Sequence, residues 1–235
     1  MRRALAVAAL ASLLGGAARP VAAELLEKTG TFAGLRVTYK VVTPDGFDPA
    51  KTYPLVLVFT GGPQTLQIAT GTIENDWRKE AERRGYIVVA PASPNGELFF
   101  EGADRIFPSF LDQLLRDYHV KGGIMHVAGH SNGGLSTFHV AARYPKYFST
   151  ITGYPGLLDG PDLARADVLK DKCLFMHVGD QDPGWMSPMQ EQAKDLAKRG
   201  FKIRIAVEKN QVHRLKAQEI DLSRRLFDEI ESCGR

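Results

Sequence analysis

Residues 124–134 are the most informative stretch of this sequence and read Ile-Met-His-Val-Ala-Gly-His-Ser-Asn-Gly-Gly. The first five are almost continuously apolar, as expected for a strand that is buried on both faces of a parallel sheet. Apolar residues then recur at helical spacing, at Leu135, Phe138, Ala141 and Ala142. The pattern predicts a tight strand–turn–helix. The serine at its centre, Ser131, must adopt a strained backbone conformation there, which holds its hydroxyl above the end of the sheet.

Further runs along the chain indicate the rest of a sheet. Short apolar or alternating segments occur at residues 35–41, 55–59, 86–89, 174–178 and 203–207. The first of them alternates apolar and polar residues, which predicts a half-exposed edge strand. Helical patterns at residues 106–115 and 222–230 separate or follow these strands. The alternation predicts a single α/β domain, in which one mostly parallel sheet carries helices on both faces and there is no large lid.

The N-terminus has the features of an export signal. Arg2 and Arg3 precede an apolar run at residues 4–14, and Val21-Ala22-Ala23 supplies the small residues that a signal peptidase requires. An apolar run of this length is too short to cross a bilayer, which takes about 20 residues. We therefore expect a signal peptide at residues 1–23 and the single α/β domain at residues 24–235. The mature chain would be periplasmic or secreted and would have no membrane span.

The charge balance of the chain gives no support to nucleic-acid binding. The whole chain has 30 Lys and Arg against 27 Asp and Glu, a formal charge of +3. The expected signal peptide contains three arginines and no acidic residue, so its removal leaves 27 basic and 27 acidic residues. A neutral chain without a basic stripe predicts no nucleic-acid partner. Nothing in the sequence predicts an oligomeric state.

A serine hydroxyl needs a neighbouring base to act as a nucleophile. In folds with this strand–turn–helix, the order along the chain is Ser, then Asp or Glu, then His. Of the six histidines, only His213 follows a loop that could supply the acid, and it comes after the last predicted strand. The competing interpretation of His213 is an ordinary exposed loop residue. His126 and His177 lie inside predicted strands, where a hydrogen-bonded core imidazole is expected.

The acid is expected in the loop after the strand at residues 174–178, which reads Gly179-Asp180-Gln181-Asp182-Pro183. It must orient the imidazole and stabilise its protonated form. We favour Asp182 over Asp180 because it lies further along the loop and Pro183 would stiffen its position. The other aspartate would then be a turn or helix-capping residue.

A tetrahedral oxyanion requires two fixed hydrogen-bond donors. One is expected from the backbone N–H of Asn132, directly after the serine. The other is expected from Gly62 or Gly61, in the loop Thr60-Gly61-Gly62-Pro63 after a buried strand. An ordinary tight turn is the alternative interpretation of this loop.

Three residues are candidates for the substrate pocket. His130 precedes the serine, and Trp185 and Phe99 lie in loops that could form an apolar wall or simply pack against the domain. No motif for a metal ion or an organic cofactor occurs, so we expect neither.

At these motifs the chain resembles the α/β-hydrolase superfamily. The supporting segments are residues 129–134, 58–63, 179–183 and 81–91, the last reading Ala-Glu-Arg-Arg-Gly-Tyr-Ile-Val-Val-Ala-Pro. Within the superfamily the chain is similar to small secreted esterases grouped with polyhydroxybutyrate depolymerases and feruloyl or acetyl-xylan esterases. The resemblance covers about residues 35–227. Two departures stand out: Thr60 replaces a histidine that is common in the oxyanion loop, and Gln211-Val212 rather than glycine precedes His213.

The expected activity is hydrolysis of a small-molecule or polymeric carboxylic ester through an acyl-enzyme, with the triad Ser131, His213 and Asp182. Alternatives are an exported peptidase and a lysophospholipase or thioesterase of the same fold. A catalytically silent binding module would be a different class.

Two cysteines remain, Cys173 and Cys233. Cys173 begins the strand that carries the acid, so it lies at the bottom edge of the predicted sheet. The last helix runs antiparallel to the strands and brings Cys233 to the same edge. We expect a disulfide between them, against the alternative of two free thiols.

Overall fold

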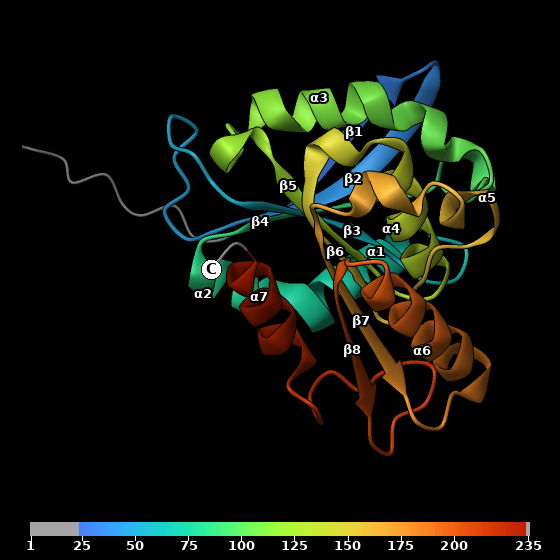
Figure 1. Cartoon of the computed structure of the whole chain (residues 1–235). Coiled ribbons are helices and arrows are strands. Elements are labelled where there is room, and N and C mark those ends of the chain that lie inside the picture. The colour runs from blue at the N-terminus through green and yellow to red at the C-terminus, as the bar shows by residue number, and fades with distance from the viewer. Residues whose placement is uncertain (1–23, 234–235) are drawn as a thin grey trace, which may run out of the picture.

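The computed structural model describes residues 24–233, and the expected signal peptide at residues 1–23 lies outside that range. The described residues form one eight-stranded sheet in the order β1-β2-β4-β3-β5-β6-β7-β8 (Figure 1). Its strands are β1 (Glu24–Phe32), β2 (Leu35–Thr43), β3 (Leu55–Phe59), β4 (Ile87–Pro91), β5 (Met125–Gly129), β6 (Phe148–Gly153), β7 (Cys173–Gly179) and β8 (Lys202–Glu208). Strands β3 to β8 run parallel, whereas β1 and β2 pair antiparallel at one end. The predicted mostly parallel α/β sheet is confirmed.

Helices cover both faces of this sheet. They are α1 (Leu66–Thr72), α2 (Arg78–Arg84), α3 (Phe107–Asp117), α4 (Asn132–Arg143), α5 (Gly160–Leu163), α6 (Pro183–Lys198) and α7 (Leu222–Ser232). A π-helical turn, η1 (Ile73–Trp77), joins α1 to α2. Short 3-10 turns occur at η2 (Pro94–Gly96), η3 (Ala103–Ile106), η4 (Lys121–Gly123), η5 (Pro145–Tyr147) and η6 (Ala166–Leu169). The buried side chains divide into two clusters, one beneath α3, α4 and α6 and the other beneath α1, η1, α2 and α7.

The prediction of an edge strand at residues 35–41 was wrong. Strand β2 lies between β1 and β4, and β1 is the edge strand. The two residues between β1 and β2, Ala33 and Gly34, both have positive φ, as a two-residue type I′ hairpin turn requires. Strand β2 alternates because one of its faces is exposed, and β1 protects its edge. Strand β1 contains Glu24, Glu27 and Lys28, and such charges discourage edge-to-edge pairing.

Strand β6 was also missed by the sequence pattern. It reads Phe-Ser-Thr-Ile-Thr-Gly, and the threonines Thr150 and Thr152 are buried in the centre of the sheet. Hydroxyl side chains interrupt the apolar run by which a central strand is recognised. The hydroxyl of Thr150 hydrogen-bonds Nδ1 of His126 at 2.9 Å, so two polar side chains satisfy each other in neighbouring strands.

The predicted disulfide between Cys173 and Cys233 is present. It joins the first residue of β7 to the residue that follows α7, at the end of the sheet opposite the strand ends where the loops carry Ser131 and Asp182. Within residues 24–233, no helix combines the length and the apolar character that a bilayer span requires.

Candidate active site

The turn between β5 and α4 has the strained conformation that the sequence predicted. Ser131 has φ of 58° and ψ of −120°, a combination that side chains rarely adopt. A Cβ on Gly129 would lie 2.2 Å from the carbonyl oxygen of Gly133, and one on Gly133 would lie 2.2 Å from that of Phe59. The glycines of the motif are therefore required by backbone packing on both sides of the turn.

The side chains of Ser131, His213 and Asp182 meet above the ends of β5, β7 and β8. The distance from Nε2 of His213 to Oγ of Ser131 is 2.8 Å. On the other side of the ring, Nδ1 lies 2.7 Å from Oδ2 of Asp182. In the neutral tautomer that fits both contacts, Nδ1–H donates to the carboxylate and Nε2 accepts from the serine hydroxyl. The His213 side chain is 41% exposed, so a substrate can reach this line of hydrogen bonds.

Asp182 reaches the imidazole because the loops after β7 and β8 are bonded to each other. Gln181 N–H donates to the carbonyl oxygen of Gln211 at 2.9 Å, and Asp180 N–H donates to that of Glu208 at 3.0 Å. The side chain of Asp180 is exposed, whereas that of Asp182 is only 14% exposed. Asp182 also accepts, through its backbone carbonyl, the first hydrogen bonds of α6. The geometry thus pairs His213 with the aspartate that the sequence favoured.

The Gly61-Gly62 turn lies directly against the turn of Ser131. His130 N–H donates to the carbonyl oxygen of Phe59 at 3.2 Å, and the side-chain amide of Asn132 donates to that of Gly62 at 2.9 Å. The backbone N–H of Asn132 belongs to the first turn of α4, where helices leave N–H groups without intrahelical partners. The expected oxyanion donors are therefore on adjoining turns that are tied together.

Gln64 holds this loop in place and was not anticipated from the sequence. Its side chain is completely buried, donates to the Ser136 hydroxyl at 2.8 Å and accepts from Phe99 N–H at 3.2 Å. Gln64 also has positive φ, which sequence patterns do not reveal for a glutamine.

His130 lies beside His213 and lines a cavity, as expected for a pocket residue. Burial lowers the pKa of His130 to about 4, so its ring is neutral at neutral pH. Its Nε2 is 3.3 Å from the backbone carbonyl oxygen of His213, which assigns the hydrogen to Nε2 because a carbonyl only accepts. The contact ties the residue before the serine to the loop that carries the base.

The two aromatic pocket candidates have different positions. Trp185 is half-buried at the start of α6, and its ring centroid lies 5.7 Å from that of His213. Phe99 is completely buried and packs against Phe59 and Phe107 in the core. The prediction that Phe99 lines the pocket was therefore wrong. Its chain segment turns inward because the Phe99 backbone is bonded to buried Gln64.

The two strand histidines are hydrogen-bonded, as predicted. His126 pairs with Thr150, and burial lowers the pKa of His126 to about 4. His177 is completely buried between two carboxylates, with Glu208 at 3.0 Å from Nδ1 and Glu229 at 2.9 Å from Nε2. Burial alone would lower the pKa of His177, but these two hydrogen bonds outweigh it and raise the pKa. Glu208 begins the loop that leads to His213.

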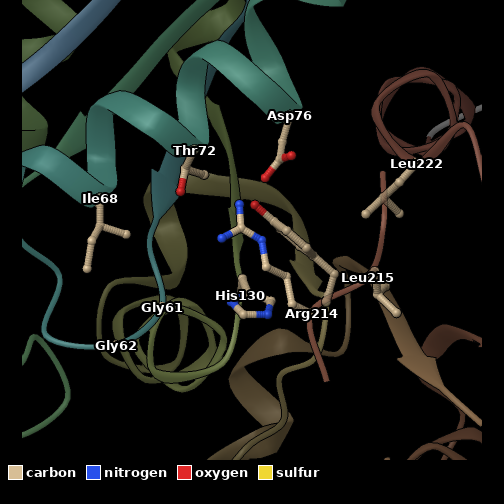
Figure 2. Close-up of a pocket in the computed structure, with 10 residues that line it drawn as sticks. Gly61, Gly62, Ile68, Thr72, Asp76, His130, Arg214, Leu215 and Leu222 are labelled. Atoms are coloured by element: carbon tan, nitrogen blue, oxygen red, sulfur yellow. The ribbon is translucent and has the colours of Figure 1, made fainter. Parts of the chain in front are cut away.

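A cavity of about 230 Å³ opens beside the Ser131 turn (Figure 2). Its polar lining includes Asp76 from η1 and Arg214, the residue after His213, neither of which was anticipated. The position of Arg214 next to the predicted base was a usable signal. Asp76 had none, because it comes from a helical turn more than fifty residues away in the sequence. Among residues 24–233, no cluster of three or more His, Cys, Asp or Glu side chains is placed to hold a metal ion.

Sequence comparison finds peptidases as relatives. The chain is 28% identical over 152 residues to dipeptidyl-peptidase 5 of Porphyromonas gingivalis, which covers 60% of this chain and 22% of that protein. The match thus spans about a fifth of the length of this curated relative. No protein-family model matches the chain.

Structural comparison finds hydrolases. A ferulic acid esterase superposes with a TM-score of 0.70 at 16% identity, covering 89% of this chain and 98% of that chain. Dienelactone hydrolase from Anabaena variabilis superposes with the same TM-score of 0.70 at 12% identity, covering 91% of this chain and 99% of that one. At these identities the likeness establishes the fold.

Proposed function

Since the chain has the α/β-hydrolase fold, we propose that it is a serine hydrolase that cleaves carboxylic esters through an acyl-enzyme. In this proposal Ser131 is the nucleophile, His213 the general base and Asp182 the group that orients the imidazole. The observation that carries it is the unbroken line of hydrogen bonds from Oγ of Ser131 through the ring of His213 to Oδ2 of Asp182.

In the first half-reaction, Oγ of Ser131 attacks the ester carbonyl carbon while its proton passes to Nε2 of His213. The imidazolium is stabilised by Asp182. The negative charge on the former carbonyl oxygen is stabilised by the backbone N–H of Asn132 and of Gly62 or Gly61. Collapse of the tetrahedral intermediate breaks the bond to the alcohol oxygen, which takes the proton from Nε2 and leaves.

In the second half-reaction, a water molecule gives a proton to Nε2 of His213 and attacks the acyl-enzyme carbonyl. The second tetrahedral intermediate expels Oγ of Ser131, which recovers the proton. The acid product leaves, and the neutral His213 tautomer is restored. No step requires a metal ion or an organic cofactor.

The test is the Ser131→Ala variant with p-nitrophenyl acetate and butyrate as substrates. We expect kcat to fall on the order of 10⁴-fold or more while the protein stays folded. A fluorophosphonate probe should label the peptide that contains Ser131 in the natural chain and leave the variant unlabelled. Ser187→Ala is a matched control because Ser187 is exposed on α6. If Ser131→Ala still turns over these esters, the proposal is wrong. A folded natural chain that neither turns over esters nor takes the probe would be a silent binding module.

A peptidase is the second candidate, because the curated relative is a dipeptidyl-peptidase. The same three residues would serve, with an amine as the leaving group. Dipeptide p-nitroanilides assayed beside the esters distinguish the two, since an ester hydrolase favours the esters by a wide margin in kcat/KM. Lysophosphatidylcholine and acyl-thioester substrates in the same panel test the lysophospholipase and thioesterase alternatives.

We also propose that the chain is exported and cleaved after Ala23. The disulfide supports this, because disulfides persist in oxidising compartments. Expression with the first 23 residues present should yield a periplasmic or secreted protein whose N-terminal residue is Glu24. Retention of Met1 in the folded product would contradict the proposal.

A further inference from the structure

The cavity beside Ser131 lies between two segments of the proposed machinery. Gly61, Gly62 and His130 form one side, and Arg214 and Leu215 form another. Ile68, Leu222, Thr72 and Tyr154 also line it. In Figure 2 the carboxylate of Asp76 and the guanidinium of Arg214 point into the same space. Ser131 and His213 are not among its lining residues, but their chain neighbours His130 and Arg214 are, so the cavity adjoins the proposed site of attack.

Asp76 is an unusual group in this cavity. It is half-buried, and within residues 24–233 its carboxylate has no hydrogen bond and no ion pair. Burial raises the pKa of Asp76, although the nearby Arg214 guanidinium opposes this. The carboxylate oxygens of Asp76 are not among the fully buried polar atoms of the described residues, so they are open to the cavity, where a donor group of a ligand can reach them.

The backbone around Asp76 is also unusual. It lies in the π-helical turn η1, which interrupts the helical segment between α1 and α2. Such turns occur often at functional sites, because they redirect a side chain that a regular helix would place elsewhere. The neighbouring Trp77 is held by a hydrogen bond from its indole N–H to the Tyr154 hydroxyl at 3.0 Å, so the turn is fixed against the residue that follows β6.

Arg214 supplies the opposite charge at the mouth of the cavity. Its side chain is exposed and, within the part of the chain that the structure describes, makes no ion pair. The carboxylate oxygens of Asp76 and the guanidinium nitrogens of Arg214 are more than 4.0 Å apart, beyond the limit for an ion pair. Arg214 would repel a cationic group of a ligand, and Asp76 would repel an anionic group. An uncharged group that donates on one side and accepts on the other satisfies both.

We propose that this cavity binds an amide group of the substrate, whose N–H donates to the carboxylate of Asp76 and whose C=O accepts from the guanidinium of Arg214. An amide suits two opposite charges on either side of a cavity because its N–H and C=O point in opposite directions. The relation to a dipeptidyl-peptidase agrees with peptide-like substrates. The inference rests on the proposed function, since it assigns the substrate class of that same site: esters or amides that carry an amide group near the reacting carbonyl.

The experiment uses pairs of substrates that differ only in the amide N–H. Ethyl N-acetylglycinate and ethyl levulinate differ by N–H against CH₂ on the acyl side. On the alcohol side, 2-acetamidoethyl acetate and 4-oxopentyl acetate differ in the same way. Hydrolysis is followed by pH-stat, and each kcat/KM is divided by the rate of hydroxide-catalysed hydrolysis. We expect the amide to be favoured over its ketone isostere about 10- to 100-fold in one of the two pairs, as for a hydrogen bond to a charged acceptor.

Variants separate the two contacts. Asp76→Leu should reduce the amide-to-ketone ratio to about one, and the more conservative Asp76→Asn should reduce it partly. Arg214→Gln should lower kcat/KM for both members of the favoured pair and leave their ratio unchanged, because both retain the carbonyl. Glu74→Leu is the matched control, since Glu74 is an exposed acid on the same turn outside this cavity. It should leave the ratio as it is.

Three results would overturn the inference. One is a ratio near one for both pairs in the natural chain, and another is a preference that persists in both Asp76 variants. The third is faster turnover of ethyl 4-aminobutanoate or monoethyl succinate, whose charged ends replace the amide. In each case hydrolysis of p-nitrophenyl acetate that depends on Ser131 would still support the proposed function. Loss of that Ser131-dependent hydrolysis would instead refute the proposed function.

Discussion

Gly179 is the position where a single added methyl group should disable the site without touching a side chain of the proposed triad. It is the last residue of β7 and lies three residues before Asp182. A Cβ at Gly179 would lie 2.1 Å from the carbonyl oxygen of Gln211 and 2.8 Å from that of Val212. Both carbonyls belong to the loop that carries His213, and neither is a flexible side-chain end that could rotate away.

The displacement required by Gly179→Ala follows from these distances. Contacts of Cβ below 3.0 Å are essentially never seen, so the loop must move by about 1 Å to accommodate the methyl group. Gly179 does not have positive φ, so alanine fits the backbone and the contact is the only source of strain. A misplacement of about 1 Å between nucleophile and base costs on the order of 10²-fold in rate. Overpacking at a buried site also costs about 1–3 kcal/mol of stability.

The assay is kcat/KM for p-nitrophenyl butyrate together with the Tm from calorimetry. Gly179→Ala should lose about 100-fold in kcat/KM and remain folded at the assay temperature. Gly184→Ala is the matched control, because Gly184 lies in the first turn of α6 and its added Cβ would meet nothing within 4 Å. The reasoning is refuted if folded Gly179→Ala keeps its kcat/KM within threefold, or if Gly184→Ala loses as much.

Three further outcomes follow from other contacts. Asp182→Asn should turn His213 to the wrong tautomer and lower kcat on the order of 10⁴-fold with little change in Tm, whereas a loss below tenfold would contradict the role of Asp182. Replacing Cys173 and Cys233 together by Ala should lower the free energy of unfolding by about 4 kcal/mol, since the disulfide closes a 60-residue loop, and should leave kcat unchanged below the new Tm. The pKa of His177 is raised from 6.5, so its stabilising contribution is complete below that pH and is lost as the pH rises through the higher folded-state pKa. Urea titrations from pH 6 upwards should show this loss in the natural chain and not in His177→Gln, and parallel curves would contradict it.

The sequence predicted the parts of the molecule that follow local rules. The strand–turn–helix around Ser131 was recognisable because continuous apolar residues, glycines and helical periodicity each report on a few neighbouring positions. The loops with Asp182 and His213 could be identified because each follows a predicted strand, and parallel strands bring such loops to the same edge of the sheet. Strand β6 was missed because its buried threonines are polar and interrupt the apolar pattern of a central strand. Their burial is tolerated because partners such as His126 hydrogen-bond them, which the sequence does not show.

The predictions that were wrong or missing depend on contacts between distant segments. Phe99 was expected at the pocket wall, but a hydrogen bond to Gln64 draws its segment into the core. Asp76 lines the cavity from a π-helical turn, and no residue type marks that turn in the sequence. Arg214 could have been considered from its position next to His213, but only the structure shows that it shares a cavity with Asp76.

The site depends chiefly on close backbone approach at three glycines. Gly129 allows β5 to pack against the first turns of α4, and Gly133 allows α4 to pack against Phe59 and Thr60. Gly179 allows the loop of Asp182 to pack against the loop of His213. At the opposite end of the sheet, the disulfide ties β7 to α7. Since these two sets of contacts share no residue, substitutions at the glycines should reduce activity more than stability. Loss of the disulfide should do the reverse, because the strand ends that carry Ser131, Asp182 and His213 remain bonded to one another.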